Sequence, residues 1–345
     1  MTRRRSLLVA GFAGAVVIVI VAVVAINPFS RPPGPGAAVP PIATSSAAPR
    51  VSTTVNPAEA PTPPARGAYF GAWVGPDVFT QANEIGAVTS LQQQLGRRLD
   101  IVHTYLKWQK PFPTPSDLHF LSQGNMLFIS WAGTAIQQIT SGADDSWIRT
   151  RARQIKALGK PVFLEWRWEM DRPNLRYQIR SAADYVKAWD HIRAIFAAAG
   201  VHNAAWVWCP TAAGFSDGRA AAFYPGDGEV DWLCADAYPQ YGSDASFAST
   251  IDPFLSWASH RHKPLMIGEF GVPQSYGPSR RAQWLRAAQQ VVLGDREIKA
   301  LVYFDANPVG QGPEGRYSLD GDAAALAAFR SMARQAYFNP ARAAG

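Results

Sequence analysis

The sequence predicts one (β/α)8 barrel, preceded by a membrane-spanning helix and a proline-rich linker. Two observations indicate this arrangement. From residue 67 onward, short β-branched or aromatic runs alternate with longer helical patterns, and eight such units fit into somewhat under 280 residues. Before residue 67 the chain holds a long uncharged apolar run and then a stretch rich in Pro, Ala, Ser and Thr.

The N-terminal apolar run, residues 7–26, is close to the ~20 residues that a helix needs to cross a bilayer. Arg3, Arg4 and Arg5 precede it, which predicts a cytoplasmic tail at 1–6 and an extracytoplasmic position for everything that follows. The run is long and rich in valine and no clear small-residue cleavage site follows, so we expect a signal anchor at the cell membrane. Secretion after signal cleavage is the alternative.

Residues 27–66 have no apolar period and are expected to form an extended linker. Most of the formal charge of +7 lies before residue 67, because residues 1–66 contribute +5 and residues 67–345 only +2. No basic stripe remains in the folded part, so nucleic acid is not an expected partner.

The eight expected strands can be read directly from the sequence. They are residues 69–74, 99–106, 125–131, 161–168, 204–209, 230–238, 263–270 and 299–305. Helical patterns lie between them, for example at 144–159, 181–200 and 279–294. An open doubly wound sheet is the competing fold, but the segment "GAWVGPD" after the first strand is not a glycine-rich phosphate turn.

Active sites of such barrels lie at the carboxyl ends of the strands, which selects a short list of polar residues. Glu169 follows the fourth strand and Glu269 ends the seventh, and these strands face one another across the barrel. Two converging carboxylates are what glycosidic bond cleavage requires, one as acid and one as nucleophile or base. The alternative is that each glutamate merely pairs with an arginine at the rim.

Aromatic and imidazole side chains near the strand ends are candidates for binding sugar rings, although tryptophans in such positions are often core residues. The candidate substrate-binding residues are Trp73, His103, Trp131, Trp168, Trp208, Tyr238 and Tyr241.

The segment "FLEWRWEMD" places Glu165, Arg167 and Glu169 at alternate positions, so all three are expected to face the barrel interior. Since an arginine beside Glu169 would lower the pKa of an acid, we expect Arg167 to lean toward Glu165. Arg172, Arg176 and Arg180 follow in the next loop. They are either a solvated surface or a binding site for an anionic or heavily hydroxylated sugar.

Cys209 and Cys234 are the only cysteines, and each lies inside an apolar run. They are expected to be buried as small hydrophobic side chains, because two cysteines form neither a disulfide framework nor a zinc spacing. No metal or organic cofactor is expected, since two carboxylates and water suffice for the predicted chemistry.

Residues 67–345 resemble glycoside hydrolase family 26, a (β/α)8 family that includes β-mannanases. The resemblance is carried by residues 129–171, by "WVWCP" at 206–210, by residues 224–241 and by "PLMIGEFG" at 264–271. It implies that Glu169 is the acid/base and Glu269 the nucleophile of a retaining mechanism. It also implies that Tyr238 hydrogen-bonds the nucleophile and keeps it ionised.

The sequence departs from the family pattern "R-x-x-H-E-M-N" around the acid/base. Glu165 and Trp168 replace the family's arginine and histidine, and Asp171 replaces its asparagine. These changes argue against mannan as the substrate more than against hydrolysis as the activity. A membrane anchor suggests that the substrate is a glycan of the cell's own envelope. A transglycosylase using the same residues and a catalytically inactive polysaccharide-binding barrel are the alternatives. The sequence indicates no protein partner.

Overall fold

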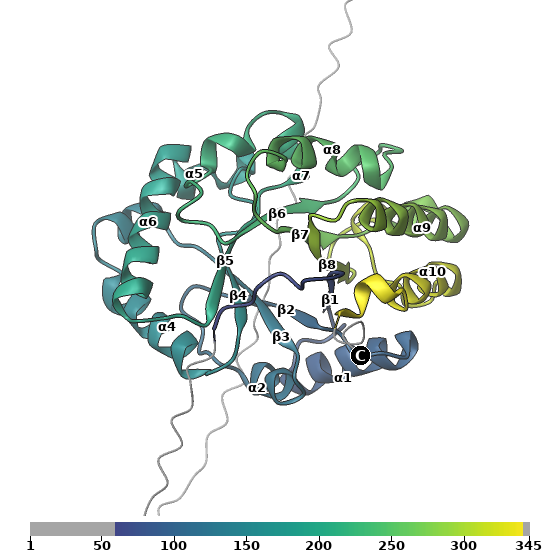
Figure 1. The fold of residues 1–345 in the computed structure, drawn as a ribbon, viewed down its shortest axis with the longest axis horizontal. Helices are drawn as coiled ribbons and strands as arrows, with labels where there is room; N and C mark the ends of the chain where they lie inside the picture. The colour runs from purple at the N-terminus through teal and green to yellow at the C-terminus, as the bar shows by residue number, and fades with distance from the viewer. Residues whose placement is uncertain (1–58, 341–345) are drawn as a thin grey trace, which may run out of the picture. The chain divides into compact units, whose positions relative to one another are not determined.

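Eight parallel strands close into a barrel in chain order, as the sequence predicts (Figure 1). A computed structural model describes residues 59–340. Each strand pairs with the next in the chain, and the first pairs with the last. The strands are β1 (Tyr69–Val74), β2 (Ile101–Leu106), β3 (Met126–Trp131), β4 (Val162–Trp166), β5 (Ala204–Trp208), β6 (Trp232–Ala237), β7 (Leu265–Phe270) and β8 (Ile298–Asp305).

Helices surround the barrel on its outside (Figure 1). Several begin at a Ser or Thr whose hydroxyl accepts a hydrogen bond from the first turn, for example Thr80 before α1 and Ser181 before α6. The helices are α1 (Gln81–Leu95), α2 (Pro115–Ser122), α3 (Ile136–Thr140), α4 (Asp145–Ala157), α5 (Arg176–Ile179), α6 (Ala182–Ala198), α7 (Ala212–Ser216), α8 (Phe247–Ala258), α9 (Pro278–Gly294) and α10 (Ala323–Ala333).

Alternation along the strands divides the apolar side chains into two cores. The larger core lies between the strands and the helices and includes Phe70, Trp131 and Trp208. The smaller core fills the barrel interior and includes Phe128 and Phe163. A strand residue therefore reaches the mouth of the barrel only if its side chain points into the barrel and it lies at the carboxyl end of its strand.

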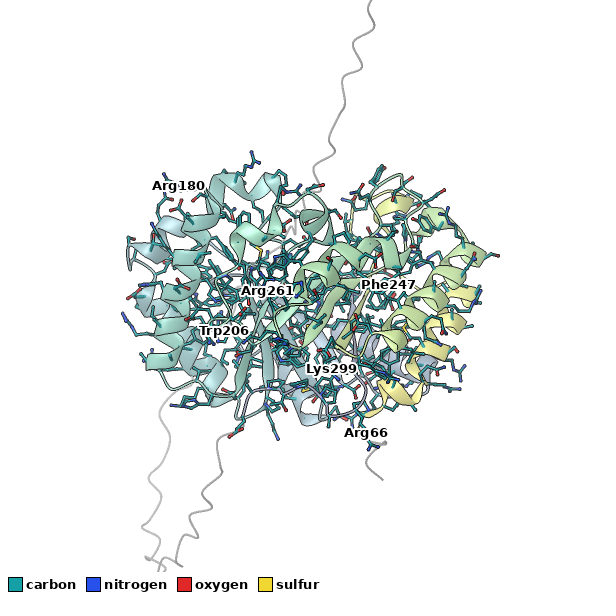
Figure 2. The ribbon with its side chains drawn as sticks, turned by 45° about the horizontal axis from the view of Figure 1, so that its top comes forward. Arg66, Arg180, Trp206, Phe247, Arg261 and Lys299 are labelled. Carbon is teal, nitrogen blue, oxygen red and sulfur yellow. A yellow bond between two sulfur atoms is a disulfide. The ribbon has the colours of Figure 1, made fainter. Side chains whose placement is uncertain are left out.

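The segment before β1 packs against the end of the barrel where the strands begin. Ala60 contacts the interior core, and the indole of Trp232 donates a hydrogen bond of 3.2 Å to the carbonyl of Pro61. Figure 2 shows Arg66 at this end of the molecule, and Arg180, in the loop after β4, at the opposite end. The candidate catalytic residues at the strands' carboxyl ends thus lie away from this segment.

The prediction that Cys209 and Cys234 are separate buried thiols is wrong, because they form a disulfide. Cys209 directly follows β5, and Cys234 lies on the neighbouring strand β6, so both side chains reach the barrel interior at nearly the same height. Sequence spacing could not reveal this pairing, since it depends on two neighbouring parallel strands being in register.

Within residues 59–340, no helix has the length and hydropathy needed to span a bilayer. The predicted anchor at 7–26 and most of the predicted linker lie outside the described residues.

Candidate active site

Strand β4 ends at Trp166, three residues before Glu169. Arg167 and Glu169 both adopt left-handed backbone conformations, with φ of 57° and 51°. This conformation costs free energy for a residue other than glycine, and residues that adopt it cluster at functional sites. The turn is held from both sides: the amide of Arg167 donates to the carbonyl of Trp131 and that of Glu169 donates to the carbonyl of Cys209, each at 2.9 Å.

Because the strand stops at Trp166, the expected alternation fails for Arg167. Its guanidinium does not lean toward Glu165 but donates a hydrogen bond to the side chain of Gln178. The side chain passes close to Gly133, where an added Cβ would come within 2.7 Å of Arg167 Cδ. The prediction for Arg167 is therefore wrong, and Arg167 does not form an ion pair with Glu169 either.

Glu169 is paired instead with Arg172, whose Nη1 lies 2.7 Å from Glu169 Oε2. Burial raises the pKa of Glu169 to about 7, although the Arg172 charge lowers it, and the negative charge of Glu269 adds to the rise. A carboxyl group with this pKa can hold a proton near neutral pH and release it during a reaction.

Asp171 fixes the loop that carries this ion pair. Its carboxylate accepts hydrogen bonds from the amide of Thr211, at 2.9 Å, and from the hydroxyl of Thr211, at 2.6 Å. Gly214 allows the close approach, since an added Cβ there would lie 1.9 Å from Asp171 Oδ2. The loop after β4 is thereby attached to the start of α7.

Glu269 lies at an irregularity of β7, where the pairing with both neighbouring strands shifts register. Its carboxylate accepts a hydrogen bond of 2.7 Å from Tyr238 Oη and a second from Tyr105 Oη. Burial raises the pKa of Glu269, while the two tyrosine donors and the charge of Arg172 oppose the rise. The two hydroxyls stabilise the ionised form that a nucleophile requires.

The absence of a side chain at Gly268 lets the backbone before Glu269 lie directly against the Cys209–Cys234 disulfide. A Cβ on Gly268 would lie 2.5 Å from the sulfur of Cys234 and 2.9 Å from that of Cys209. The disulfide therefore packs directly against the backbone that precedes Glu269.

Two further carboxyl groups lie in the barrel interior near the catalytic candidates. Glu165 accepts a hydrogen bond from Ser130, which is 2.7 Å from the Nε2 of His103, and Asp236 lies beside the disulfide. Burial and the neighbouring carboxylates raise the pKa of both acids well above their ordinary values. Both shifts favour the protonated form, which limits the negative charge in the interior.

Some of the predicted aromatic residues do lie beside the carboxylates. Trp73 and Trp168 flank Tyr105, with ring centroids 5.0 and 5.2 Å away, and Tyr105 contacts Glu269. Trp168 is partly exposed, and Trp73 is mostly covered by its stacking on the exposed Phe79. Together with Tyr238, these residues remain candidates for contact with a sugar.

The structure corrects three of the four remaining substrate-binding predictions, those for Trp131, Trp208 and His103. Trp131 and Trp208 point to the helix side of the sheet and are fully buried there, so neither can stack on a sugar. His103 lies one layer too deep, stacked on Phe128, and burial lowers its pKa to about 3. Tyr241 is 81% exposed and makes one weak contact with Glu314 in the described part of the chain, so its role as a sugar contact stays a prediction.

Tyr105 and Tyr317 are site residues that the sequence reasoning missed. Strand alternation alone could have identified Tyr105, because it lies on the same strand face as His103 and one layer nearer the mouth of the barrel. Tyr317 gave no signal, since it lies in the loop after β8. Its ring packs against Gly271 and lies 4.7 Å from that of Tyr238.

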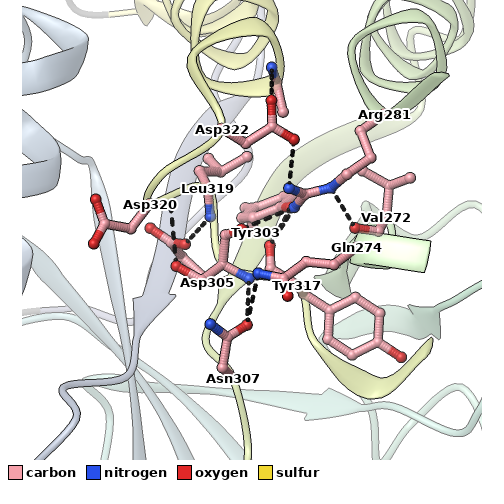
Figure 3. Close-up of polar contacts among 12 residues, drawn as sticks. Val272, Gln274, Arg281, Tyr303, Asp305, Asn307, Tyr317, Leu319, Asp320 and Asp322 are labelled. Atoms are coloured by element: carbon pink, nitrogen blue, oxygen red, sulfur yellow. Dashed lines mark hydrogen bonds and ion pairs between the residues drawn. The ribbon is translucent and has the colours of Figure 1, made fainter. Parts of the chain in front are cut away.

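A buried network holds the Tyr317 loop in place (Figure 3). Arg281 donates to Asp322 at 2.7 Å and to the carbonyls of Val272, Tyr317 and Ser318. Tyr303 donates a further hydrogen bond to the Tyr317 carbonyl, at 2.7 Å. Arg281 and Asp322 thus connect α9 to α10 and fix the loop between β8 and α10.

Within residues 59–340, Cys209, Cys234 and Asp236 form the one group of side chains close enough together to be considered as metal ligands. Both sulfurs are already joined to each other, so this group does not offer the thiolates that a metal would need.

The arrangement supplies the two functions that acid-assisted displacement at an acetal carbon needs. Glu169 can donate a proton to a leaving oxygen, because its pKa lies near neutrality. Glu269 is held by two phenolic donors and can attack as a carboxylate. The partly exposed Tyr238 contacts Glu269, and the partly exposed Trp168 packs on Tyr105 beside it.

Comparisons with known proteins support a resemblance to glycosidases. No family model matches the chain. It is 28% identical to Endoglucanase H of Acetivibrio thermocellus over 296 residues, which is 79% of this chain but 31% of that protein. It is also 28% identical to Beta-1,3-xylanase TXYA of a Vibrio species over 201 residues, half of this chain and 41% of that protein. The chain thus spans well under half the length of these relatives.

Among solved structures, the chain is similar to the catalytic domain of a Bacillus family 26 endo-β-1,4-mannanase. The TM-score is 0.61 at 16% identity, with 80% of this chain and 88% of that domain covered. This similarity shows the fold and agrees with the family 26 resemblance in the sequence.

Proposed function

We propose that the protein is a glycoside hydrolase that cleaves internal β-glycosidic bonds of an extracellular or cell-envelope polysaccharide. Glu169 is the acid/base and Glu269 the nucleophile of a retaining double displacement. One observation carries this proposal: two buried glutamates at the carboxyl ends of the strands act on each other through their charges and lie in environments that suit opposite roles. Burial raises the pKa of Glu169 to about 7, whereas Tyr105 and Tyr238 both donate to Glu269.

The reaction would follow from these positions in two steps. Glu169 gives its proton to the glycosidic oxygen as Glu269 attacks the anomeric carbon, so the leaving sugar departs with that proton. Glu169, now ionised, takes a proton from water, and the resulting hydroxide displaces Glu269 from the sugar. The charge of Arg172 stabilises the ionised Glu169 between the two steps.

The test compares the full-length protein with its Glu269→Ala variant on β-mannan, mixed-linkage β-glucan, xylan and envelope polysaccharides, with released reducing ends as the readout. We expect at least one polymer to be cleaved by the wild type and not by the variant. Glu297→Ala is the matched control, because Glu297 is exposed and precedes β8 at the other end of the barrel. Binding of a polymer without cleavage by either protein would replace this proposal with the binding-barrel alternative.

The roles of the two glutamates can be separated with azide. If Glu269 is the nucleophile, azide rescues Glu269→Ala and yields the glycosyl azide of inverted configuration. If Glu169 is the acid/base, azide rescues Glu169→Ala and yields the retained anomer. Rescue with the opposite pairing of anomers would contradict the assignment.

We further propose that the domain acts outside the cytoplasm, attached to the cell membrane by residues 7–26. The Cys209–Cys234 disulfide supports this location, because such bonds persist mainly in oxidising compartments. Deleting residues 1–26 should move the protein from the membrane fraction to the soluble fraction. If the protein expressed without this deletion is found in the soluble fraction in a shortened form, the cleaved-signal alternative is favoured.

A further inference from the structure

Phe79 lies in the loop between β1 and α1, at the same end of the barrel as Glu169 and Glu269. The residue is 58% exposed. One face of its ring stacks on Trp73, with ring centroids 5.6 Å apart and ring planes inclined by 20°. The exposed area of Phe79 therefore lies on the side of the ring that faces away from Trp73.

A continuous series of aromatic contacts connects Phe79 to the candidate nucleophile. Trp73 packs edge-on against Tyr105, with ring centroids 5.0 Å apart and ring planes at 90°. Tyr105 in turn donates its hydroxyl hydrogen bond to Glu269. The series starts at the buried carboxylate and ends at the exposed ring of Phe79.

The loop holds Phe79 in a defined position. Before it, the carbonyl of Val78 accepts a hydrogen bond of 2.9 Å from the side chain of Asn83. After it, Thr80 is the N-cap of α1, and its hydroxyl accepts a hydrogen bond of 3.1 Å from the amide of Asn83. A binding surface that is ordered before its ligand arrives loses less conformational entropy on binding.

Exposed large apolar side chains in the described part of the chain gather around the mouth of the barrel. They are Val78, Phe79, Leu118, Tyr177, Tyr241 and Val309. All except Leu118, which lies on α2, are in segments that follow the carboxyl ends of strands. Single exposed apolar residues need no explanation, whereas a grouping at the end that carries the carboxylates indicates a surface that contacts a ligand.

A pyranose ring fits the exposed face of Phe79. The face of an aromatic ring is negative, so it attracts the weakly positive C–H groups on the face of a β-linked sugar. Stacking also removes apolar area of both rings from water, while the hydroxyls at the edge of the sugar stay hydrated. A polymer that places one sugar at Glu269 carries its neighbouring sugars along the mouth of the barrel.

We infer that Phe79 forms a further subsite, where it stacks on a sugar of the polysaccharide that lies beyond the sugar attacked by Glu269. The inference rests on the proposed function, because it takes Glu269 as the nucleophile. Since Trp73 lies between Phe79 and Tyr105, the sugar on Phe79 is not the attacked one. An oligosaccharide has to exceed a certain length before it can use this subsite.

The experiment uses the full-length protein and measures kcat/KM on manno-, mixed-linkage gluco- and xylo-oligosaccharides of increasing length. Phe79→Leu removes the flat ring but keeps an apolar cover on Trp73. We expect this variant to lose about two- to tenfold in kcat/KM on the longer oligosaccharides, the range of one aromatic ring contact. On the shortest oligosaccharide that the wild type cleaves, we expect no loss.

Two further variants complete the design. Phe79→Tyr keeps the ring and should retain the wild-type value at every length. Leu118→Ala is the matched control, because Leu118 is 52% exposed on α2 and lies outside the segments that follow the strands. The inference is overturned if Phe79→Leu loses nothing at any length. It is also overturned if the loss is the same on the shortest oligosaccharide, because Phe79 would then act through Trp73 rather than on a distant sugar.

These outcomes are distinct from failure of the proposed function. Cleavage that Glu269→Ala abolishes, with no length-dependent loss in Phe79→Leu, would retain the hydrolase and reject the subsite. If the wild type cleaves no oligosaccharide, calorimetric binding of the longest members of the three series to the wild type and to Phe79→Leu decides. Weaker binding by the variant would support the subsite on a barrel that binds without cleaving, and equal binding or none would reject it.

Discussion

Removing either tyrosine that donates to Glu269 should shift the acid side of the pH–activity profile to higher pH. Tyr105 and Tyr238 each donate one hydrogen bond to this carboxylate. A hydrogen bond to a charged group contributes about 1.5–3 kcal/mol, and one pKa unit corresponds to about 1.4 kcal/mol. Tyr105→Phe or Tyr238→Phe should therefore raise the pKa of Glu269, because each removes one of the two hydrogen bonds that lower it.

The consequence for activity follows from the direction of this shift. Burial already raises the pKa of Glu269, and the hydrogen bonds oppose that rise. At pH values below the new pKa, each variant should lose about ten- to a hundredfold in kcat/KM, because less of the nucleophile is ionised. Activity cannot recover fully at higher pH, since Glu169 loses its proton near pH 7. The active range should thus become narrower.

The assay measures kcat/KM from pH 4 to 9 on a polymer that the wild type cleaves. Tyr69→Phe is the matched control, because it removes a phenol at the other end of the barrel, where Tyr69 donates to the carbonyl of Thr62. Folding is checked by the urea midpoint. If both site variants fold and their acid limbs coincide with that of the wild type, the assigned role of the tyrosines is refuted.

Three further predictions concern stability and its pH dependence. Because burial raises the pKa of Glu169, the folded state keeps a proton that the unfolded chain releases. The Glu169 contribution to the free energy of unfolding should therefore fall by up to about 3 kcal/mol as the pH rises from 4.5 to 7. Urea titrations of the Glu169→Gln variant should lack this contribution. Cys209→Ser with Cys234→Ser should lower the unfolding free energy by about 2–4 kcal/mol and also reduce kcat, because Gly268 loses its support; an unchanged kcat would contradict the second part. Arg281→Met should cost about 3–5 kcal/mol by leaving Asp322 unpaired, and adding Asp322→Asn should recover much of it if the unpaired charge is the cause.

The sequence was sufficient to predict the barrel, because each strand and helix carries its own local pattern. It also predicted which carboxylates reach the mouth, since Glu169 and Glu269 follow strands that face one another. The prediction for Arg167 failed where the strand pattern stops: its positive φ turns the side chain away from Glu165. Trp131 and Trp208 were assigned to the wrong side of the sheet, although strand alternation alone could have placed them facing the helices.

Other features depend on contacts that no local pattern encodes. The disulfide requires β5 and β6 to be neighbours in one particular register. Tyr317 comes to the site through a loop that Arg281 holds from α9. The pairing of Glu169 with Arg172 depends on a turn that Asp171 fixes from a third element.

The hydrogen bond between Trp232 and the Pro61 carbonyl shows at which end of the barrel the N-terminal segment joins it. The polypeptide joins the barrel at the closed end, where Ala60 covers the interior core, and the carboxylates open at the other end. The chain upstream of residue 59 is therefore joined at the end of the barrel opposite Glu169 and Glu269. If the proposed anchor and the proposed hydrolase activity both hold, a polymer could cross the mouth and be cut internally without meeting the point of attachment.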